Sequence, residues 1–300
     1  MLNAILKRTF TTSLRDFSRY TLPYKSPLNI NSCDFSKVTN TLRQYFLEKG
    51  FVEAHTQNRL SILSACEDPF TVSTFDYAGH KWPLPQTGQM WLEYELLQNP
   101  SVPGFFCVST SYRNEPDPIE GRHLLSFPMF EFEMKGGKDE MIAMEKELLS
   151  FLGYNPSAYQ ENNYNSVLND YKISQIENEH ENRLCKNNPV FFLTDFPEFT
   201  DPFWNMKRNK ITGKANKVDV LLSGHETIGS AERETDKDEM LYRFDTILNG
   251  AYKEKLYSLF GKERTDAELK EFMDFDFFER SGGGIGLTRL IRSMKKENLL

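Results

Sequence analysis

The stretch Phe105-Phe-Cys-Val-Ser-Thr-Ser-Tyr-Arg113-Asn-Glu115, continued after a polar loop by Arg122-His123-Leu-Leu-Ser-Phe127-Pro-Met-Phe-Glu-Phe-Glu133-Met134, decides the fold of this chain. Its first half is rich in β-forming residues, and its second half alternates large apolar residues with acids, a pattern that predicts two strands. Residues 116–121 between them have the composition of a turn. We therefore expect a hairpin with a long charged loop.

Charged side chains gather where this hairpin closes. Residues two apart on a strand point to the same side, so Arg113 and Glu115 are expected to face one cavity. Taken alone, the two residues are equally well explained by a cross-strand ion pair. The order of the whole stretch, in which Arg122, His123 and Phe127 follow the loop, favours a binding site instead.

The order of these residues resembles motif two of the class II aminoacyl-tRNA synthetases, in the aspartyl/asparaginyl subclass. The resemblance implies that Arg113 holds the α-phosphate of ATP and Glu115 the adenine amino group. It also implies that Arg122 and His123 reach the outer phosphates, and that Phe127 stacks on adenine. The chemistry is consistent, because a guanidinium group offers a planar fork of donors to phosphate.

Composition sets limits on the class of protein. A chain of 300 residues, 39% of them hydrophobic and 13% aromatic, can form one large domain with a sizeable core. The net charge of −7 argues weakly against a nucleic-acid-binding surface. The four cysteines are widely spaced without a Cys-x-x-Cys, which indicates a reducing compartment and no structural zinc. No apolar run reaches membrane-spanning length, so no membrane partner is expected.

The N-terminal segment differs from the rest of the chain. Residues 1–29 contain several basic residues but only one acid, Asp16, and in composition they resemble a mitochondrial presequence. The alternative is an ordinary basic helix that packs on the domain. We expect an extension over 1–29 and a catalytic domain over 30–300, with a polar helical insertion at about 153–189 in which His180 is solvated. A cytoplasmic location is expected, with the mitochondrial matrix as the alternative.

Further segments resemble two parts of the family's fold, the dimer interface and the amino-acid pocket. A helix over 34–49 and a strand over 51–56 resemble motif one, the dimer interface of the family, so a homodimer is implied. Glu67 resembles the loop glutamate that approaches the substrate α-ammonium group. The run Gln86-Thr87-Gly-Gln89 resembles the segment that opens the helix beside the pocket, so these three side chains are implied to line it.

Glu93 bears on the choice of amino acid. The aspartyl enzymes have a lysine where this chain has Leu92, whereas the asparaginyl enzymes share the Leu92-Glu93 pair. A lysine suits an anionic side chain, but a glutamate can accept a hydrogen bond from an amide NH₂ group. The pocket therefore favours asparagine. The alternative is a surface glutamate on an amphipathic helix.

A second predicted hairpin carries two acids, Asp219 and Glu226. A tight turn near Leu222-Ser223 would place them directly opposite each other, with Cβ atoms about 5 Å apart. Two carboxylates at that distance repel unless a cation lies between them, and Mg²⁺ takes one or two carboxylates together with phosphate oxygens. The resemblance implies the same two ligands for Mg²⁺, and implies that Arg233 grips the amino-acid side chain. An exposed hairpin is the alternative.

The C-terminal region is expected to form a helix over 238–260, a strand over 272–278, and a glycine-rich segment, Ser281-Gly-Gly-Gly-Ile-Gly286, that runs into a last helix. Glycines before a helix N-terminus form an anion site. The segment resembles motif three, which implies that Gly286 lies beside ATP and that Arg289 contacts its γ-phosphate. Thr288 replaces an acid of the family, and uncharged residues there also occur in the ammonia-dependent asparagine synthetases of the same fold. The alternative is a plain glycine loop with a surface arginine.

Together the motifs imply an α+β fold, a class II synthetase-like antiparallel β-sheet flanked by helices, with no anticodon-binding barrel because the core begins near residue 28. The implied reaction is adenylation: a substrate carboxylate attacks the α-phosphorus of ATP, and Arg113, Arg289 and Mg²⁺ stabilise the charge while pyrophosphate leaves. The first hypothesis for the acceptor is ammonia, with aspartate converted to its amide without tRNA. The second is transfer to a tRNA, which is possible but not favoured, or to a protein. The third is a pseudo-enzyme that acts as a binding partner.

Overall fold

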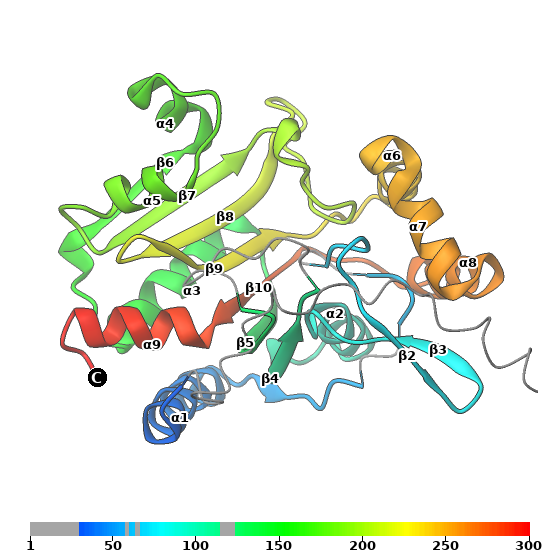
Figure 1. The fold of residues 1–300 in the computed structure, drawn as a ribbon, viewed down its shortest axis with the longest axis horizontal. Coiled ribbons are helices and arrows are strands. Elements are labelled where there is room, and N and C mark those ends of the chain that lie inside the picture. Colours follow the sequence, from blue (N-terminus) through cyan, green and yellow to red (C-terminus); the bar gives the residue numbers. More distant parts are fainter. Residues whose placement is uncertain (1–29, 58–59, 64–66, 115–123) are drawn as a thin grey trace, which may run out of the picture.

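The computed structural model describes residues 30–57, 60–63, 67–114 and 124–300. An eight-stranded sheet crosses this part of the chain in the order β1-β4-β5-β10-β9-β8-β7-β6 (Figure 1). Its inner pairs are antiparallel, and only the two edge pairs, β1 with β4 and β6 with β7, are parallel. The strands are β1 (Val52–Glu53), β4 (Gly104–Tyr112), β5 (Ser126–Lys135), β6 (Tyr159–Asn163), β7 (Val190–Phe196), β8 (Ala215–Leu222), β9 (His225–Glu232) and β10 (Arg280–Gly286). The expected antiparallel sheet is confirmed.

The hairpin that organises the sequence is strands β4 and β5. Ser111 lies opposite Phe127 near its open end, so the expected pair of strands is confirmed. Arg113 follows directly after β4, and its backbone N–H donates to the carbonyl of Leu125 at 2.8 Å. The loop residues 115–123 lie outside the described residues.

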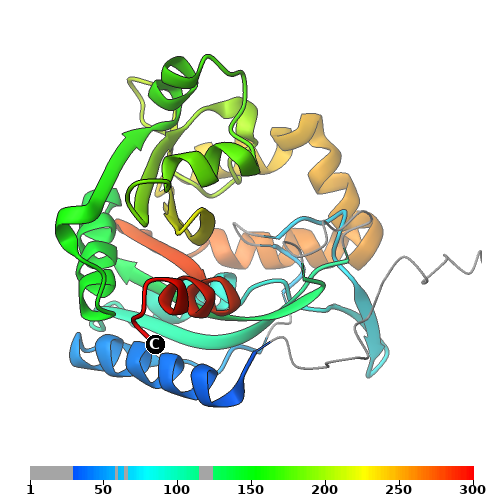
Figure 2. The ribbon, with the colours of Figure 1, turned by 60° about the vertical axis from the view of Figure 1, so that its left-hand side comes forward.

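Three helices cover one face of the sheet: α1 (Ser32–Glu48), α3 (Lys138–Phe151) and α9 (Leu287–Lys296) (Figure 2). Phe46 of α1 packs between the rings of Phe106, Phe130 and Phe132, with centroid distances of 5.7, 5.1 and 5.6 Å. Burying each such ring contributes about 1.5–3 kcal/mol. The predicted helix is confirmed, whereas the predicted strand over 51–56 is reduced to the two residues of β1.

The opposite face carries α2 (Gln89–Gln98) and the helices α6 (Lys237–Thr246), α7 (Ala251–Phe260) and α8 (Lys262–Met273). These helices meet around Trp204, whose ring makes edge contacts with Phe244 and Phe272. The indole N–H donates to the carbonyl of Leu63 at 3.1 Å. A two-stranded ribbon, β2 (Thr74–Tyr77) and β3 (His80–Pro83), projects beside α8 (Figure 1).

Two expectations for the C-terminal half are wrong. The single helix over 238–260 is broken, because Leu248, Asn249 and Gly250 have φ values of 53°, 55° and 84°. A right-handed helix cannot pass through successive residues with positive φ. The expected strand over 272–278 is also absent, since Phe272 and Met273 form the buried last turn of α8.

The insertion at 153–189 is helical only in part. It contains α4 (Tyr164–Tyr171) and α5 (Asn178–Leu184), but also the edge strand β6. The prediction that His180 is solvated is wrong, because the side chain is buried. Its Nδ1 accepts a hydrogen bond from the backbone N–H of Glu177 at 3.0 Å and so caps α5. In the described ranges, no helix is long and apolar enough to span a bilayer.

Candidate functional site

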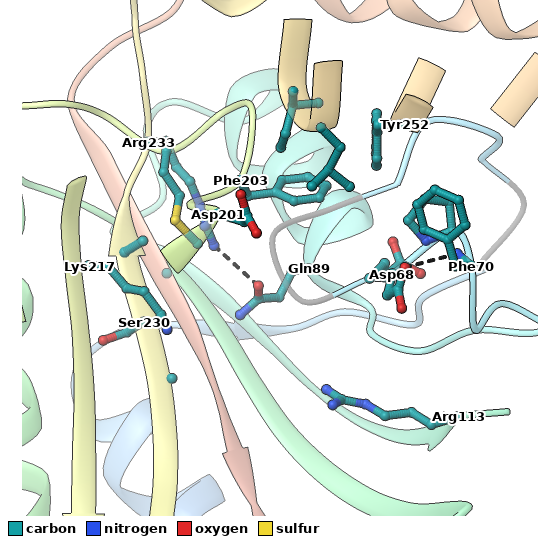
Figure 3. Close-up of a pocket in the computed structure, with 18 of the residues that line it drawn as sticks. Asp68, Phe70, Gln89, Arg113, Asp201, Phe203, Lys217, Ser230, Arg233 and Tyr252 are labelled. Atoms are coloured by element: carbon teal, nitrogen blue, oxygen red, sulfur yellow. Dashed lines mark hydrogen bonds between the residues drawn. The ribbon is translucent and has the colours of Figure 1, made fainter. Parts of the chain in front are cut away.

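A cavity of about 510 Å³ lies on the face of the sheet that carries α2. Its walls come from the loop before β2, from α2, from the end of β4, from β8 and β9, and from the break between α6 and α7. Arg113 and Arg233 approach the cavity from different sides, with Gln89 between them (Figure 3). The predicted site residues that line it are Glu67, Gln89, Arg113, Glu226 and Arg233.

Arg113 and Phe127 form one side of the site. The carbon of the guanidinium group lies 5.6 Å from the centroid of the Phe127 ring. This distance is within the range of a cation–π contact. The structure therefore brings together the predicted phosphate-binding arginine and the predicted adenine platform. Glu115, Arg122 and His123, which were predicted to complete this subsite, lie outside the described residues.

The register of the second hairpin differs from the prediction. The turn between β8 and β9 is Ser223-Gly224, where φ is 50° and 96°. A two-residue hairpin turn of this type needs positive φ at both positions, which suits glycine and disfavours the branched Leu222. This turn places Glu226 opposite Leu221, and a bulge between Val220 and Leu221 places Asp219 opposite Gly229. The prediction that Asp219 and Glu226 face each other directly is therefore wrong.

The two carboxylates nevertheless converge above Gly229. A Cβ atom built on Gly229 would lie 3.1 Å from Glu226 Oε1 and 3.7 Å from Asp219 Oδ1. Both oxygens thus occupy space that any side chain at residue 229 would fill. Burial raises the pKa of Asp219 to about 7, with Lys217 opposing this rise and Glu226 adding to it.

The carboxylates of Asp219 and Glu226 suit a divalent cation that takes its remaining oxygen ligands from a substrate. Asp219 Oδ1 is buried and has no hydrogen-bond partner among the described residues. No group of three or more His, Cys, Asp or Glu side chains in the described ranges is arranged to hold a metal. Two carboxylates without a third protein ligand suit Mg²⁺, which usually keeps phosphate and water oxygens in its shell.

Arg233 is held by a buried carboxylate that the sequence did not assign. Its Nη2 donates to Glu133 Oε2 at 2.9 Å and its Nε to Glu133 Oε1 at 3.1 Å. Its Nη2 also lies 3.4 Å from Gln89 Oε1. Burial raises the pKa of Glu133, and the guanidinium of Arg233 opposes that rise. The alternation Phe130-Glu-Phe-Glu133 was the available signal, since acids on the inner strand of a sheet require partners.

Glu93 is not among the residues that line the cavity. Its carboxylate is fully buried and accepts hydrogen bonds from Asn205 at 2.7 Å and from Arg280 Nη2 at 2.8 Å. It also lies 3.5 Å from Arg233 Nε. Both of its oxygens are therefore used by the protein, which differs from the predicted direct contact with a substrate amide. The alternative of a surface glutamate is wrong.

Gln86 and Thr87 support the cavity without lining it. Gln86 Oε1 accepts from the backbone N–H of Asp68 at 2.9 Å, and its amide donates to Thr71 Oγ1 at 3.0 Å. These bonds fix the loop that carries Glu67 into the cavity. The Thr87 hydroxyl donates to Glu131, whose other oxygen accepts from the N–H of Gly88 at 2.8 Å. This pair anchors the start of α2.

Arg289 lies beside the acidic hairpin. Its Nη1 donates to the backbone oxygen of Glu226 at 2.6 Å, and Gly286 is the N-cap of α9. The three glycines before it belong to the inner strand β10 and not to a turn. At Gly282 a Cβ would lie 1.7 Å from Glu133 Oε2, so these glycines allow close packing of strands. Of the glycines expected before the helix N-terminus, only Gly286 stands there, and the alternative of a plain glycine loop is wrong.

Comparison with known proteins identifies the family. The model of the class II tRNA synthetases (D, K and N) matches residues 22–299, so the chain belongs to this family of ATP-dependent ligases. The aspartate–tRNA(Asp) ligase of Thermoplasma volcanium is 25% identical over 236 residues, which cover 68% of this chain and 53% of the relative. The chain therefore spans about half the length of this curated relative.

Solved structures share the fold at low identity. The asparaginyl-tRNA synthetase of Pyrococcus horikoshii, complexed with asparaginyl-adenylate, has a TM-score of 0.72 at 20% identity, covering 93% of this chain and 68% of that one. The asparaginyl-tRNA synthetase of Entamoeba histolytica with asparaginyl-adenylate has a TM-score of 0.70 at 17% identity, covering 88% and 63%. A putative aspartyl-tRNA synthetase of Leishmania major Friedlin has a TM-score of 0.68 at 18% identity, covering 86% and 60%.

Proposed function

We propose that this protein forms an aminoacyl adenylate of the aspartate/asparagine type from ATP, with release of pyrophosphate. The observation that supports this most is the convergence on one cavity of Arg113, Arg233 and Glu226, which come from separate segments, with an Asp219 oxygen close to that of Glu226 above Gly229. In this reaction a substrate carboxylate attacks the α-phosphorus. No residue needs to become covalently modified, because positioning and fixed charges stabilise the transition state.

ATP is proposed to bind along the β4–β5 side of the cavity. Arg113 would hold the α-phosphate and Phe127 would stack on adenine, an arrangement that their 5.6 Å contact permits. Arg289 donates to the backbone oxygen of Glu226 and would contact the outer phosphates. Asp219 and Glu226 would hold Mg²⁺, which when bound neutralises charge on the phosphate oxygens.

The amino-acid side chain is proposed to lie against Arg233. Around this residue two guanidinium groups, of Arg233 and Arg280, are balanced by two buried carboxylates, of Glu93 and Glu133. The cluster has no net charge, so it presents no uncompensated cation to a substrate carboxylate. An amide can both donate and accept hydrogen bonds, so it suits such a neutral cluster. Asparagine is accordingly the first candidate to be activated at its α-carboxylate, and aspartate is the second.

The acceptor of the adenylate has two candidates. Ammonia, which would give a free amide from aspartate, is supported by the uncharged Thr288 before Arg289, a feature shared with ammonia-dependent asparagine synthetases. A tRNA is supported by the names of the relatives, which are tRNA ligases. A homodimer formed through α1 and β1 is also proposed, because Leu47 and Val52 are 55% and 44% exposed there.

Two assays test the proposal. Amino-acid-dependent exchange of labelled pyrophosphate into ATP, run with each of the twenty amino acids, should respond to asparagine or aspartate; no response to any of them would refute adenylation. AMP release is then measured with aspartate and ammonia, and separately with asparagine or aspartate and tRNA. Release that requires ammonia selects amide formation, whereas release that requires tRNA selects aminoacylation.

A further inference from the structure

Lys217 is a cavity residue to which the adenylation reaction assigns no role. It lies two residues before Asp219 on β8, so the two side chains project from the same face of the strand. Its Nζ lies 3.0 Å from Asp219 Oδ2, and its side chain lines the same cavity as Glu226 and Arg233. Figure 3 shows it beside Ser230 at the hairpin wall.

The ammonium group is held in this position from two sides. Besides the carboxylate of Asp219, it lies 4.1 Å from the centroid of the Phe196 ring on the neighbouring strand β7. Phe196 is only 4% exposed, and a backbone bulge at Asp195 precedes it. A cation placed this close to an aromatic face is stabilised there. Lys217 is therefore positioned by the fold and is not a chance surface contact.

We propose that Lys217 is a built-in counter-cation of the Asp219–Glu226 pair, and that it makes metal binding at this pair depend on bound nucleotide. The inference rests on the proposed function, in which these acids hold Mg²⁺. When both carboxylates are ionised, as metal ligands are, the pair without Lys217 would carry two negative charges, which one divalent cation neutralises. With Lys217 the pair carries one negative charge, so a divalent cation leaves one positive charge in excess.

Nucleotide phosphates remove that excess. Lys217 occupies Oδ2 of Asp219 and leaves Oδ1, which is buried and has no hydrogen-bond partner among the described residues, as the oxygen open to a metal. Repulsion between the ammonium and the metal weakens binding to the protein alone. When phosphate oxygens enter the cavity, their negative charge compensates for both cations. The metal is then retained only together with the nucleotide.

The test measures free Mn²⁺ by electron paramagnetic resonance, with the full chain in excess, without nucleotide and with an ATP analogue that cannot be cleaved at the α–β bridge. Variants K217M and K217Q remove the charge, and K217R retains it. K210M removes one positive charge from the exposed loop before β8 and is the matched control. D219N removes the proposed ligand. Thermal unfolding establishes which variants are folded, and either K217M or K217Q suffices.

The expected result is that K217M or K217Q binds Mn²⁺ without nucleotide about tenfold more tightly or better than the wild type. K217R and K210M should behave as the wild type does. Unchanged affinity in K217M and K217Q, while D219N still lowers binding with the analogue present, would overturn the role of Lys217 and leave the metal site intact. Equal Mn²⁺ binding by D219N and the wild type with the analogue would instead overturn the metal site itself, and the inference with it.

Discussion

The guanidinium of Arg233 and the carboxylate of Glu133 form a two-point ion pair across strands, with Nη2–Oε2 at 2.9 Å and Nε–Oε1 at 3.1 Å. The side chains are 1% and 0% exposed. A charge that is buried this deeply is tolerated only when it is paired. The pair therefore fixes Arg233 in the cavity wall, and its geometry depends on the absence of a side chain at Gly282.

Replacing Glu133 by glutamine should destabilise the protein and weaken amino-acid binding. The change leaves the guanidinium of Arg233 buried with less compensating charge, which costs about 3 kcal/mol. Urea unfolding measures this loss, and the KM for the amino acid in pyrophosphate exchange should rise. Glu147→Gln is the control, because that glutamate pairs with Lys49 on the surface and its loss should cost less than about 1 kcal/mol. Equal stabilities for the two variants would contradict this role of the pair.

Gly282→Ala should disturb the same pair sterically. The new Cβ would lie 1.7 Å from Glu133 Oε2 and 2.6 Å from the backbone oxygen of Phe132, so the strands must separate. A destabilisation of about 1–3 kcal/mol or more is expected. Gly286→Ala is the control for stability, since the nearest atom to its Cβ would be 3.7 Å away. If the two alanine variants unfold at the same urea concentration, close packing at Gly282 is not required.

Glu145 should make stability depend on pH. Its carboxylate lies buried on α3, and burial raises its pKa from 4.5 to about 8, with Ser230 opposing this rise and Asp219 adding to it. The folded state thus keeps a proton that the unfolded state loses, so this group lowers stability progressively as pH rises from about 4.5 to about 8. Glu145→Gln lacks the titration. Relative to the wild type, its free energy of unfolding should increase by roughly 1.4 kcal/mol per pH unit within that window.

The measurement is urea unfolding of both proteins at several pH values between 5 and 9. The difference between wild type and Glu145→Gln reports Glu145 together with its electrostatic coupling to Asp219, because the buried acids that do not interact with Glu145 titrate alike in both proteins. Parallel stability curves for the two proteins across the window would show that Glu145 is ionised in the fold.

Arg113→Ala should abolish adenylation and leave the fold intact. Removing a charge that stabilises a transition state lowers the rate by about 100- to 1,000-fold or more. Pyrophosphate exchange measures the rate, and thermal unfolding verifies the fold. Arg183→Ala is the control, because that arginine stacks at 4.6 Å on Tyr171 in the insertion, outside the cavity. Full exchange activity in Arg113→Ala would remove the proposed phosphate contact.

The sequence predicted those helices and strands whose apolar residues follow a regular spacing. The β4–β5 hairpin follows from alternation, and α1 follows from helical spacing of apolar residues. The position of Lys217 beside Asp219 could also have been predicted locally, because the two residues are two apart on one strand.

What the sequence did not predict depends on contacts between distant residues. The strand formed by the glycines of β10 was not predicted, because the carboxylate of Glu133 that needs their empty space lies on another strand. Glu93 appeared available to a substrate, because its partner Arg280 is far away in the chain. The predicted register of Asp219 was wrong because the turn lies at Ser223-Gly224 and a bulge follows Val220, which only the paired strands reveal.

The central claim is that one aminoacyl adenylate fills the cavity between Arg113 and Arg233. A crystal structure with a non-hydrolysable asparaginyl or aspartyl adenylate analogue tests this most directly. We expect its adenine on Phe127, its phosphate mimic at Arg113 and its amino-acid side chain at Arg233. An analogue that binds elsewhere on the protein, or that fails to bind at saturating concentration, would contradict the account.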